Sequence, residues 1–304
     1  MIGGLEPVRS SRIHSLCFSL KYPFGFCGLQ HICSDIIGNL DYNLLLYRNS
    51  LRITLSVWKA LLLREALSRL FSSRGAWFWL IAEPVAHMAV LGFLYAGIRQ
   101  HTIGGIDALI WLVIGLQGYF LFKRTSGQMS GAIDSNRALF SYRQVQPIDA
   151  VLIRGVLEAV LMVAVIIVVF AGLAMIGYDI EPADPIIILQ AFFGLWLFAV
   201  AVGLIVSAAA EVAPEIRQIF NMVMMPLYFI SGVMIPIASV PEPYRDWLLI
   251  NPLVHALDGA REGFAPYYHT APGISMDYLY AWAVIGLFIG LLLHRRFANL
   301  MVTR

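Results

Sequence analysis

Charged residues are scarce in this sequence, and their scarcity excludes many protein classes. Only 13% of the 304 residues are charged, while 59% are hydrophobic. An ordinary soluble domain carries about 25% charged residues. The composition therefore excludes an ordinary soluble globular protein and indicates a chain that lies largely in a membrane.

Motifs of common enzymes and metal proteins are also absent. The three lysines, Lys21, Lys59 and Lys123, lie outside any glycine-rich phosphate loop, so the chain does not bind ATP through a P-loop. No His-Glu-x-x-His zinc helix and no Gly-x-Ser-x-Gly elbow occurs. The three cysteines match no zinc or disulfide framework. We expect no catalytic residue, no resident cofactor, no metal site and no nucleic-acid partner.

Long apolar runs are what the sequence does contain. The runs are Trp77 to Ile98, Asp107 to Phe122, Val151 to Ile176, Ile186 to Ala210, Ile219 to Ile237 and Tyr278 to Leu293. Their lengths are close to what a helix needs to cross a hydrocarbon core about 30 Å thick. Continuous runs exclude the alternating pattern of a β-barrel. The sequence predicts an all-α polytopic membrane protein with six transmembrane helices.

The positions of the positive charges predict the orientation of these spans. Of the 21 Lys and Arg residues, only Arg99, Arg245 and Arg261 fall in outer segments if the amino terminus is inside. Cytoplasmic loops of membrane proteins carry an excess of Lys and Arg. Both termini are therefore predicted to be cytoplasmic.

The first 50 residues differ from the rest of the chain. They are mixed in polarity, lack a clear hydrophobic period and contain all three cysteines. Lys21 and Pro23 interrupt the apolar stretch, which does not fit a secretory signal. We expect residues 1–50 to be a disordered extension or the result of a mis-assigned translation start, with a regulatory extension as the alternative.

Residues 51–75 are predicted to form an amphipathic helix. Leu63 and Leu67 lie on one face of the helical period, while Arg64 and Glu65 lie on the other. Such a helix before the first span is typical of one that lies in the inner membrane interface. A simple cytoplasmic extension of the first span is the alternative. Residues 76–304 are predicted to form the transmembrane domain.

Ionisable residues inside predicted spans are costly and need an explanation. Glu83 precedes Pro84, which removes a backbone hydrogen bond and can kink the first span. A proton relay through Glu83 and His87 would suit a secondary transporter, but we favour a structural role for both near the inner end. Glu158 is expected to pair with Arg154, four residues earlier on the same helix.

Two inner connections have the length or charge to meet a partner protein. The larger, 123–150, contains a short amphipathic segment that ends at Pro147. The smaller, 211–217, turns at Pro214. Each is predicted to be a cytoplasmic contact.

The outer stretch 231–272 is rich in proline but keeps apolar pieces. This mixture predicts short helices that dip back into the membrane. Within it His255, Asp258 and Glu262 share a helix face, and we interpret them as polar groups at the outer water interface rather than as metal ligands.

Several stretches, taken in order, resemble one family: the membrane subunits of type 2 ABC exporters, and in particular the KpsM-type permeases of group 2 capsular polysaccharide export. The stretches are Leu63-Arg-Glu65, Ala82-Glu-Pro-Val-Ala-His87, Gly131-Ala-Ile133, Leu139-Phe-Ser-Tyr-Arg143, Pro147-Ile-Asp149, Pro226-Leu-Tyr-Phe-Ile-Ser231, Asn251-Pro-Leu-Val-His255 and Arg261-Glu262. The resemblance covers about Val57 to the carboxyl end.

The resemblance implies a homodimeric permease with six spans, an interfacial helix and re-entrant helices before the last span. It implies two copies of a separate ATP-binding cassette subunit, which binds ATP and Mg. The implied cargo is a lipid-linked acidic capsular polysaccharide that crosses the bacterial inner membrane. A periplasmic co-polymerase-like protein and an outer-membrane channel are the implied further partners. Export of another lipid-linked glycan, of O-antigen or teichoic acid type, and a proton-coupled secondary transporter are the alternatives.

The resemblance and the residue types together define three sets of site residues. ATPase coupling is assigned to Asp134, Arg137, Tyr142, Arg143, Pro147, Asp149, Glu211, Glu215 and Arg217. A structural or gating role is assigned to Arg64, Glu65, Glu83, Pro84, Asn251, Pro252, Arg261 and Glu262. A translocation pathway, in which sugar rings slide on aromatic faces and cations attract an acidic polymer, is assigned to Tyr95, Trp111, Tyr119, Phe122, Lys123, Arg124 and Tyr228. Packing and interface anchoring are the alternatives for the aromatic residues, and the inward bias of positive charge for the cations.

Overall fold

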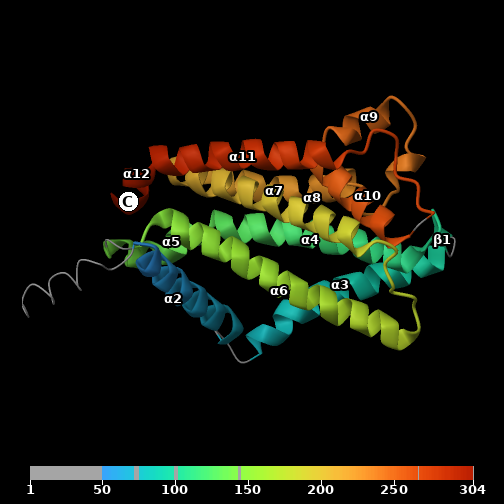
Figure 1. The fold of residues 1–304 in the computed structure, drawn as a ribbon, viewed down its shortest axis with the longest axis horizontal. Coiled ribbons are helices and arrows are strands. Elements are labelled where there is room, and N and C mark those ends of the chain that lie inside the picture. The colour runs from blue at the N-terminus through green and yellow to red at the C-terminus, as the bar shows by residue number, and fades with distance from the viewer. Residues whose placement is uncertain (1–49, 72–74, 99–101, 143–144, 266, 304) are drawn as a thin grey trace, which may run out of the picture. The chain divides into compact units, whose positions relative to one another are not determined.

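The computed structural model describes residues 50–71, 75–98, 102–142, 145–265 and 267–303 (Figure 1). The chain divides into two units, Met1–Ile53 and Thr54–Arg304, and each is considered by itself. Of the first unit only residues 50–53 are described. The extension predicted for residues 1–50 therefore lies almost wholly outside the described residues, as does Arg143.

The described part of the chain is almost entirely helical, as the apolar runs predict. Its helices are α2 (Ser50–Phe71), α3 (Ala76–Ile98), α4 (Ala108–Ser130), α5 (Ala132–Asn136), η2 (Arg137–Ser141), α6 (Pro147–Ile176), α7 (Pro185–Val212), α8 (Glu215–Ile230), η3 (Ile237–Ser239), α9 (Tyr244–Leu249), α10 (Pro252–Phe264), α11 (Met276–Arg296) and α12 (Ala298–Thr303). Between α3 and α4 lies a small antiparallel hairpin of β1 (Thr102–Ile103) and β2 (Ile106–Asp107). Gly104 and Gly105 form its turn with φ of 58° and 90°, a conformation that favours glycine.

Within the described residues, three helices are long and apolar enough to cross a membrane: α6, α7 and α11. Helices α3 and α4 cover two more of the predicted runs, and α3 contains the apolar stretch Ile81–Leu94. The run predicted to extend to Ile237 ends earlier, because α8 stops at Ile230 and Gly232 takes a φ of 73°. At about 1.5 Å per residue α8 is about 24 Å long, shorter than a hydrocarbon core of about 30 Å.

Helix ends are fixed by polar side chains next to apolar runs. Asp107 caps α4 by accepting a hydrogen bond from the backbone N–H of Leu109. Asp184 caps α7 in the same way through two backbone N–H groups, and Gln146 with Asp149 forms a capping box at the start of α6. These caps satisfy donors that a helix leaves unpaired at its first turn.

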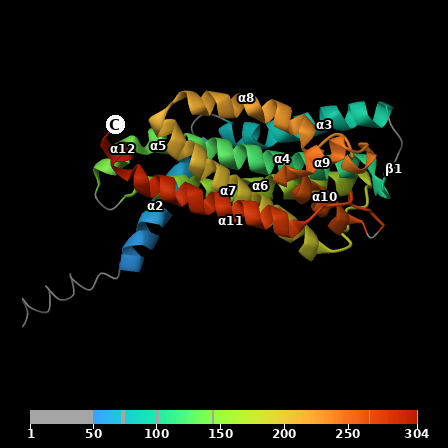
Figure 2. The same cartoon turned by 90° about the horizontal axis from the view of Figure 1, so that it is seen from above.

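Close packing of α7 against α11 uses two glycines of α11, Gly286 and Gly290, which lie four positions apart on one helix face. A Cβ atom at Gly286 would lie 3.0 Å from the Cβ of Ala201, and one at Gly290 would lie 2.7 Å from the Cβ of Leu204. The glycine pair therefore serves contact within the chain. Figure 2 shows α8 and part of α3 along one edge of the second unit and α11 along the opposite edge.

The two ends of the second unit carry different elements. Helices α5 and α12 lie at one end, and β1, α9 and α10 lie at the other (Figure 1). The larger inner connection and the smaller one, 211–217, both belong to the end with α5, which agrees with their predicted position on one side of the membrane.

Candidate coupling site and translocation surface

Four charged residues join the two predicted inner loops. Arg137 of η2 donates to Asp134 (2.6 Å) and to Glu211 at the end of α7 (2.8 Å). Arg217 of α8 lies 2.7 Å from Asp134 and donates to the carbonyl oxygen of Ser130 (3.0 Å). We call Asp134, Arg137, Glu211 and Arg217 the coupling cluster. It brings together residues that the sequence separates by more than seventy positions.

Ion pairing within the coupling cluster favours the charged forms of Asp134 and Arg137. Burial acts to raise the pKa of Asp134, but hydrogen bonds and attraction from Arg137 and Arg217 outweigh it and lower that pKa. The hydrogen bond to Asp134 raises the pKa of Arg137. Glu211 is buried while Asp134 is exposed, so the cluster has one side in the protein and one at the surface.

The other residues assigned to coupling take different positions. Tyr142 ends η2 with 65% of its surface exposed. Glu215 is exposed in the first turn of α8, and Pro147 is the first residue of α6. Asp149 belongs to the capping box and accepts a hydrogen bond from the Trp58 indole (2.9 Å), so its side chain anchors α2. Arg143 lies outside the described residues.

Helix α2 meets the rest of the second unit through a face of mixed polarity, on which Leu61 and Glu65 are buried. Leu63 and Leu67 are exposed, at 58% and 48%, whereas Glu65 is buried. Trp58, Glu65 and Arg69 recur on one face at helical spacing, and this pattern could have predicted the contact surface, which was missed. Arg64 is exposed beside these leucines, and the interfacial position of α2 stays a prediction.

Five charged residues where α2 meets α4 and α6 form what we call the buried charge network: Glu65, Arg69, Arg124, Arg154 and Glu158. Arg154 of α6 donates to Glu65 (2.5 Å), Arg69 pairs with Glu158, and Arg124 of α4 lies 3.5 Å from Glu158. The prediction that Glu158 pairs with Arg154 on the same helix is wrong. Both residues instead pair with α2, because a partner across the packed interface is nearer than the neighbour along the helix.

An aromatic cluster occupies the face shared by α3, α4 and α8. The ring of Tyr228 lies 5.0 Å from that of Tyr119 and 6.4 Å from that of His87, which is 5.3 Å from Phe120. Tyr119 donates its hydroxyl to the Met224 carbonyl oxygen. Within the described part of the chain the buried hydroxyl of Tyr228 has no hydrogen-bond partner. Two residues of the predicted pathway, Tyr119 and Tyr228, are therefore brought together.

Other residues of the predicted pathway lie elsewhere. Trp111 is fully buried beneath the guanidinium of Arg261, and Phe122 stacks on Phe198 in the core. Because Trp111 and Phe122, like Tyr119, expose almost no surface, the pathway proposed below uses the rings of Tyr228 and His87. Lys123 is exposed one turn from Tyr119, and Arg124 belongs to the buried charge network. The side chain of Tyr95 lies outside the described side chains.

In α3 the helix runs through Pro84 without ending, and the side chain of Glu83 is exposed. His87, one turn further, makes the ring contacts of the aromatic cluster. The structural role that we favoured for Glu83 and His87 stays a prediction.

Arg261 of α10 holds the turn that follows α8. It donates to the carbonyl oxygens of Gly232 (2.9 Å), Val233 (3.2 Å) and Trp111 (3.3 Å), and its side chain is fully buried. Asn251 caps α10, in which Pro252 is the first residue, and donates to Ser231 (3.0 Å). Residues assigned a structural or gating role therefore fix the junction between α8 and α10, while Glu262 is exposed.

The trio His255, Asp258 and Glu262 is used differently from the prediction. His255 is buried and contacts the Leu249 carbonyl oxygen (2.8 Å), and Asp258 is buried and accepts hydrogen bonds from Tyr268 (2.5 Å) and the backbone of Ala271 (2.9 Å). The predicted placement at an outer water interface is wrong for His255 and Asp258, because residues 267–275 fold over α10 and cover them, whereas Glu262 is exposed. Among the described residues no group of ligands suits a metal ion.

Comparison with known families identifies the class of protein to which this geometry belongs. Residues 56–265 match the ABC-2 type transporter family, so the chain belongs to that family of membrane proteins. The chain is 35% identical to the polysialic acid transport protein KpsM of Escherichia coli over 245 residues, which cover 81% of this chain and 95% of KpsM.

Two further relatives share most of their length with this chain. The capsule polysaccharide export inner-membrane protein CtrC of Neisseria meningitidis is 28% identical over 222 residues, 72% of this chain and 82% of CtrC. The capsule polysaccharide export inner-membrane protein BexB of Haemophilus influenzae is 26% identical over 218 residues, with the same coverage. The resemblance predicted from the sequence motifs is confirmed.

Proposed function

We propose that this chain is the permease subunit of an ATP-driven exporter that moves lipid-linked capsular polysaccharide across the bacterial inner membrane. The relatives above are a polysialic acid transport protein and two capsule export inner-membrane proteins. The structural observation that supports the proposal is the coupling cluster, which makes the two inner loops one ionically linked unit. A permease that is driven by a separate ATPase needs such a unit, because movements of the ATPase must be transmitted to its membrane helices.

In the proposed assembly two copies of this chain bind two copies of a separate ATP-binding cassette subunit at the end that carries α5. That subunit binds ATP and Mg and hydrolyses the ATP. The inward bias of positive charge supports a cytoplasmic position for this end and for both termini. Closure of the ATPase would displace α5 and the turn between α7 and α8 together, and reorient α4, α7 and α8 as rigid bodies.

The aromatic cluster is the proposed wall for the polymer. Sugar rings can slide on the faces of Tyr228 and His87 without a fixed register, because an aromatic face offers apolar contact rather than directed hydrogen bonds. The exposed ammonium of Lys123 lies on the same face of α4 and would attract an acidic polymer. A periplasmic co-polymerase-like protein and an outer-membrane channel are the expected later partners.

Co-purification with the ATPase tests the proposal. We expect Tyr142→Ala to reduce the amount of ATPase retained by this chain at least about tenfold, since a central interface tyrosine contributes about 2 kcal/mol or more. The measurement is the ratio of the two subunits after purification through a tag on this chain alone.

Tyr244→Ala is the matched control for this test. Tyr244 is 59% exposed, close to the 65% of Tyr142, but lies in α9 at the opposite end of the second unit. Equal retention of the ATPase by the two variants would remove Tyr142 from the interface. Failure of the unmodified chain to retain any ATPase would refute the proposed function itself.

A charge swap in the coupling cluster tests force transmission separately from binding. Arg137→Glu places three carboxylates together and is expected to lower the ATP-driven export rate about tenfold, equivalent to about 1.4 kcal/mol of barrier. Arg137→Glu combined with Glu211→Arg restores opposite charges at the 2.8 Å contact and is expected to recover much of the rate. The measurement is the ratio of polymer at the cell surface to polymer retained inside the cell. If the double variant did not recover export, the proposed coupling role of the Arg137–Glu211 pair would be contradicted.

A further inference from the structure

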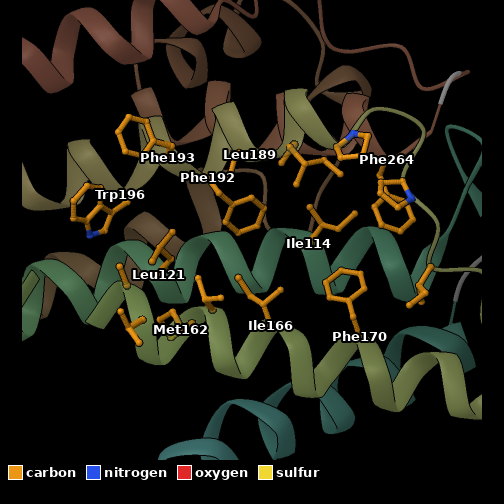
Figure 3. Close-up of a pocket in the computed structure, with 18 of the residues that line it drawn as sticks. Ile114, Leu121, Met162, Ile166, Phe170, Leu189, Phe192, Phe193, Trp196 and Phe264 are labelled. Atoms are coloured by element: carbon orange, nitrogen blue, oxygen red, sulfur yellow. The ribbon is translucent and has the colours of Figure 1, made fainter. Parts of the chain in front are cut away.

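An apolar groove of about 640 Å³ lies behind α4, between α6 and α7. Figure 3 shows Phe192 of α7 and Ile166 and Phe170 of α6 converging over Ile114 of α4. Trp196 lies toward one end and Phe264 of α10 toward the other. The groove exists because α6 and α7 each pack more extensively against α4 than against each other.

The chemistry of the walls restricts what can fill the groove. All lining side chains are hydrophobic, and the single N–H group among them, the Trp196 indole, already donates to the Gly155 carbonyl oxygen (3.0 Å). Sugars and water would lose hydrogen bonds there without replacement. The occupant must therefore be a hydrocarbon.

The groove is continuous with the surface of two membrane-crossing helices. Helices α6 and α7 are both long and apolar enough to cross a membrane. The rims of the groove include Val160, Val163 and Leu189, which are 60%, 54% and 71% exposed. Between Pro185 and Trp196 the wall is about 16 Å long at ~1.5 Å per residue, close to the ~15 Å that one leaflet contributes to a hydrocarbon core of about 30 Å.

The groove also lies on the side of α4 away from the aromatic cluster. With 3.6 residues per turn, Ile114 and Leu121 share one face of α4, whereas Tyr119 and Lys123 lie on the opposite face. A cargo that passes along the aromatic cluster does not reach the groove without crossing α4. This separation favours a resident lipid over the lipid anchor of the cargo.

We propose that the groove binds an acyl chain of a membrane phospholipid. Because the groove lies behind α4, its occupant affects how easily α4 can move. Helix α4 leads directly into α5, which carries part of the coupling cluster. A close-packed core resists displacement, whereas a fluid chain can rearrange as α4 shifts. The site itself does not depend on the function proposed above, because a lipid chain can be detected on the chain at rest.

A bulky side chain in the groove provides the first test. Val163→Trp fills the groove, and Val284→Trp places the same ring on the lipid-facing side of α11, where Val284 is 61% exposed. Native mass spectrometry of protein extracted in mild detergent is expected to show a phospholipid that the control retains and Val163→Trp loses. Equal phospholipid retention by both variants would overturn the proposal.

Cells with and without polymer synthesis distinguish the other occupants. Retention of the lipid in both kinds of cell supports a membrane phospholipid. A lipid that appears only when polymer is made would instead assign the groove to the cargo anchor. A change in oligomeric state with Val163→Trp but not Val284→Trp would assign it to a helix of a second copy.

Fluorescence quenching provides a second test that needs no groove-filling variant. Phospholipids with brominated acyl chains quench tryptophan on contact, and the contribution of Trp196 is obtained by comparison with Trp196→Phe. We expect this contribution to be quenched as strongly as that of Trp282, which is 43% exposed on α11 and measured through Trp282→Phe. An unquenched Trp196 beside a quenched Trp282 would overturn the proposal.

Discussion

Glu158→Gln is expected to destabilise the protein by about 3–5 kcal/mol, the usual cost of removing one partner from a buried ion pair. Glu158 is fully buried and contacts Arg69 and Arg124, whose side chains are only 14% and 19% exposed. The neutral amide removes one of the two carboxylates of the buried charge network. Its three arginines, Arg69, Arg124 and Arg154, are then left with Glu65 alone. The measurement is the apparent melting temperature of the protein in detergent, monitored by its intrinsic tryptophan fluorescence.

The loss is also expected to be local at first. Since Arg69 connects α2 to α6 through Glu158, amide hydrogen exchange should rise in residues 54–71 before it rises elsewhere. Glu181→Gln removes an exposed carboxylate from the connection between α6 and α7 and serves as the control. If both variants melt together, or if exchange in α2 is unchanged, the buried charge network does not hold α2.

The long spans could be predicted from the sequence because one-dimensional hydropathy is enough to define them. Helices α6, α7 and α11 follow predicted runs closely. The end of α8 was missed since the apolar run continues to Ile237 although the chain turns at Gly232. Hydropathy records whether a segment prefers lipid, and it does not record where the backbone leaves the helix.

The two inner loops were predicted as separate contacts with a partner protein. The ion pairs that join them in the coupling cluster were not predicted. Arg137 and Glu211 meet only because α4 and α7 end side by side, a relation that one sequence does not contain. The same limit explains the wrong pairing of Glu158 with Arg154. The rule that residues four positions apart on one helix can pair does not take into account the residues of other helices.

The contact face of α2 shows a related limit. Amphipathic spacing divides α2 into an apolar and a polar face, but the buried face combines Leu61 with Glu65, while Arg64 is exposed beside Leu63. In a membrane protein an apolar side chain can face lipid and a charged one can meet protein. Glu65 and Arg69 are therefore contact residues, while Leu63 and Leu67 face outward. Which face packs inward follows from the solvent, not from the pattern alone.

Arg261→Met is expected to produce the other large loss of stability, again about 3–5 kcal/mol. The substitution keeps much of the side-chain volume but removes the donors to the carbonyl oxygens of Gly232, Val233 and Trp111. An unpaired buried acceptor costs about 1–3 kcal/mol, and buried Asp258 loses the cation at 3.9 Å. The melting temperature should fall, and hydrogen exchange should rise in the turn after α8 and in α10.

Arg261→Lys separates charge from geometry at the same position. A lysine keeps the positive charge but lacks the planar fork that reaches several carbonyl oxygens at once, so an intermediate loss is expected. Arg296→Met, at an exposed position in the last turn of α11, is the control for removal of an arginine. If Arg261→Met were no worse than Arg296→Met, the junction between α8 and α10 would be held by Asn251 and packing instead. If Arg261→Lys matched the unmodified protein, the charge beside Asp258 would be the property that matters, and the hydrogen bonds to the turn would be secondary.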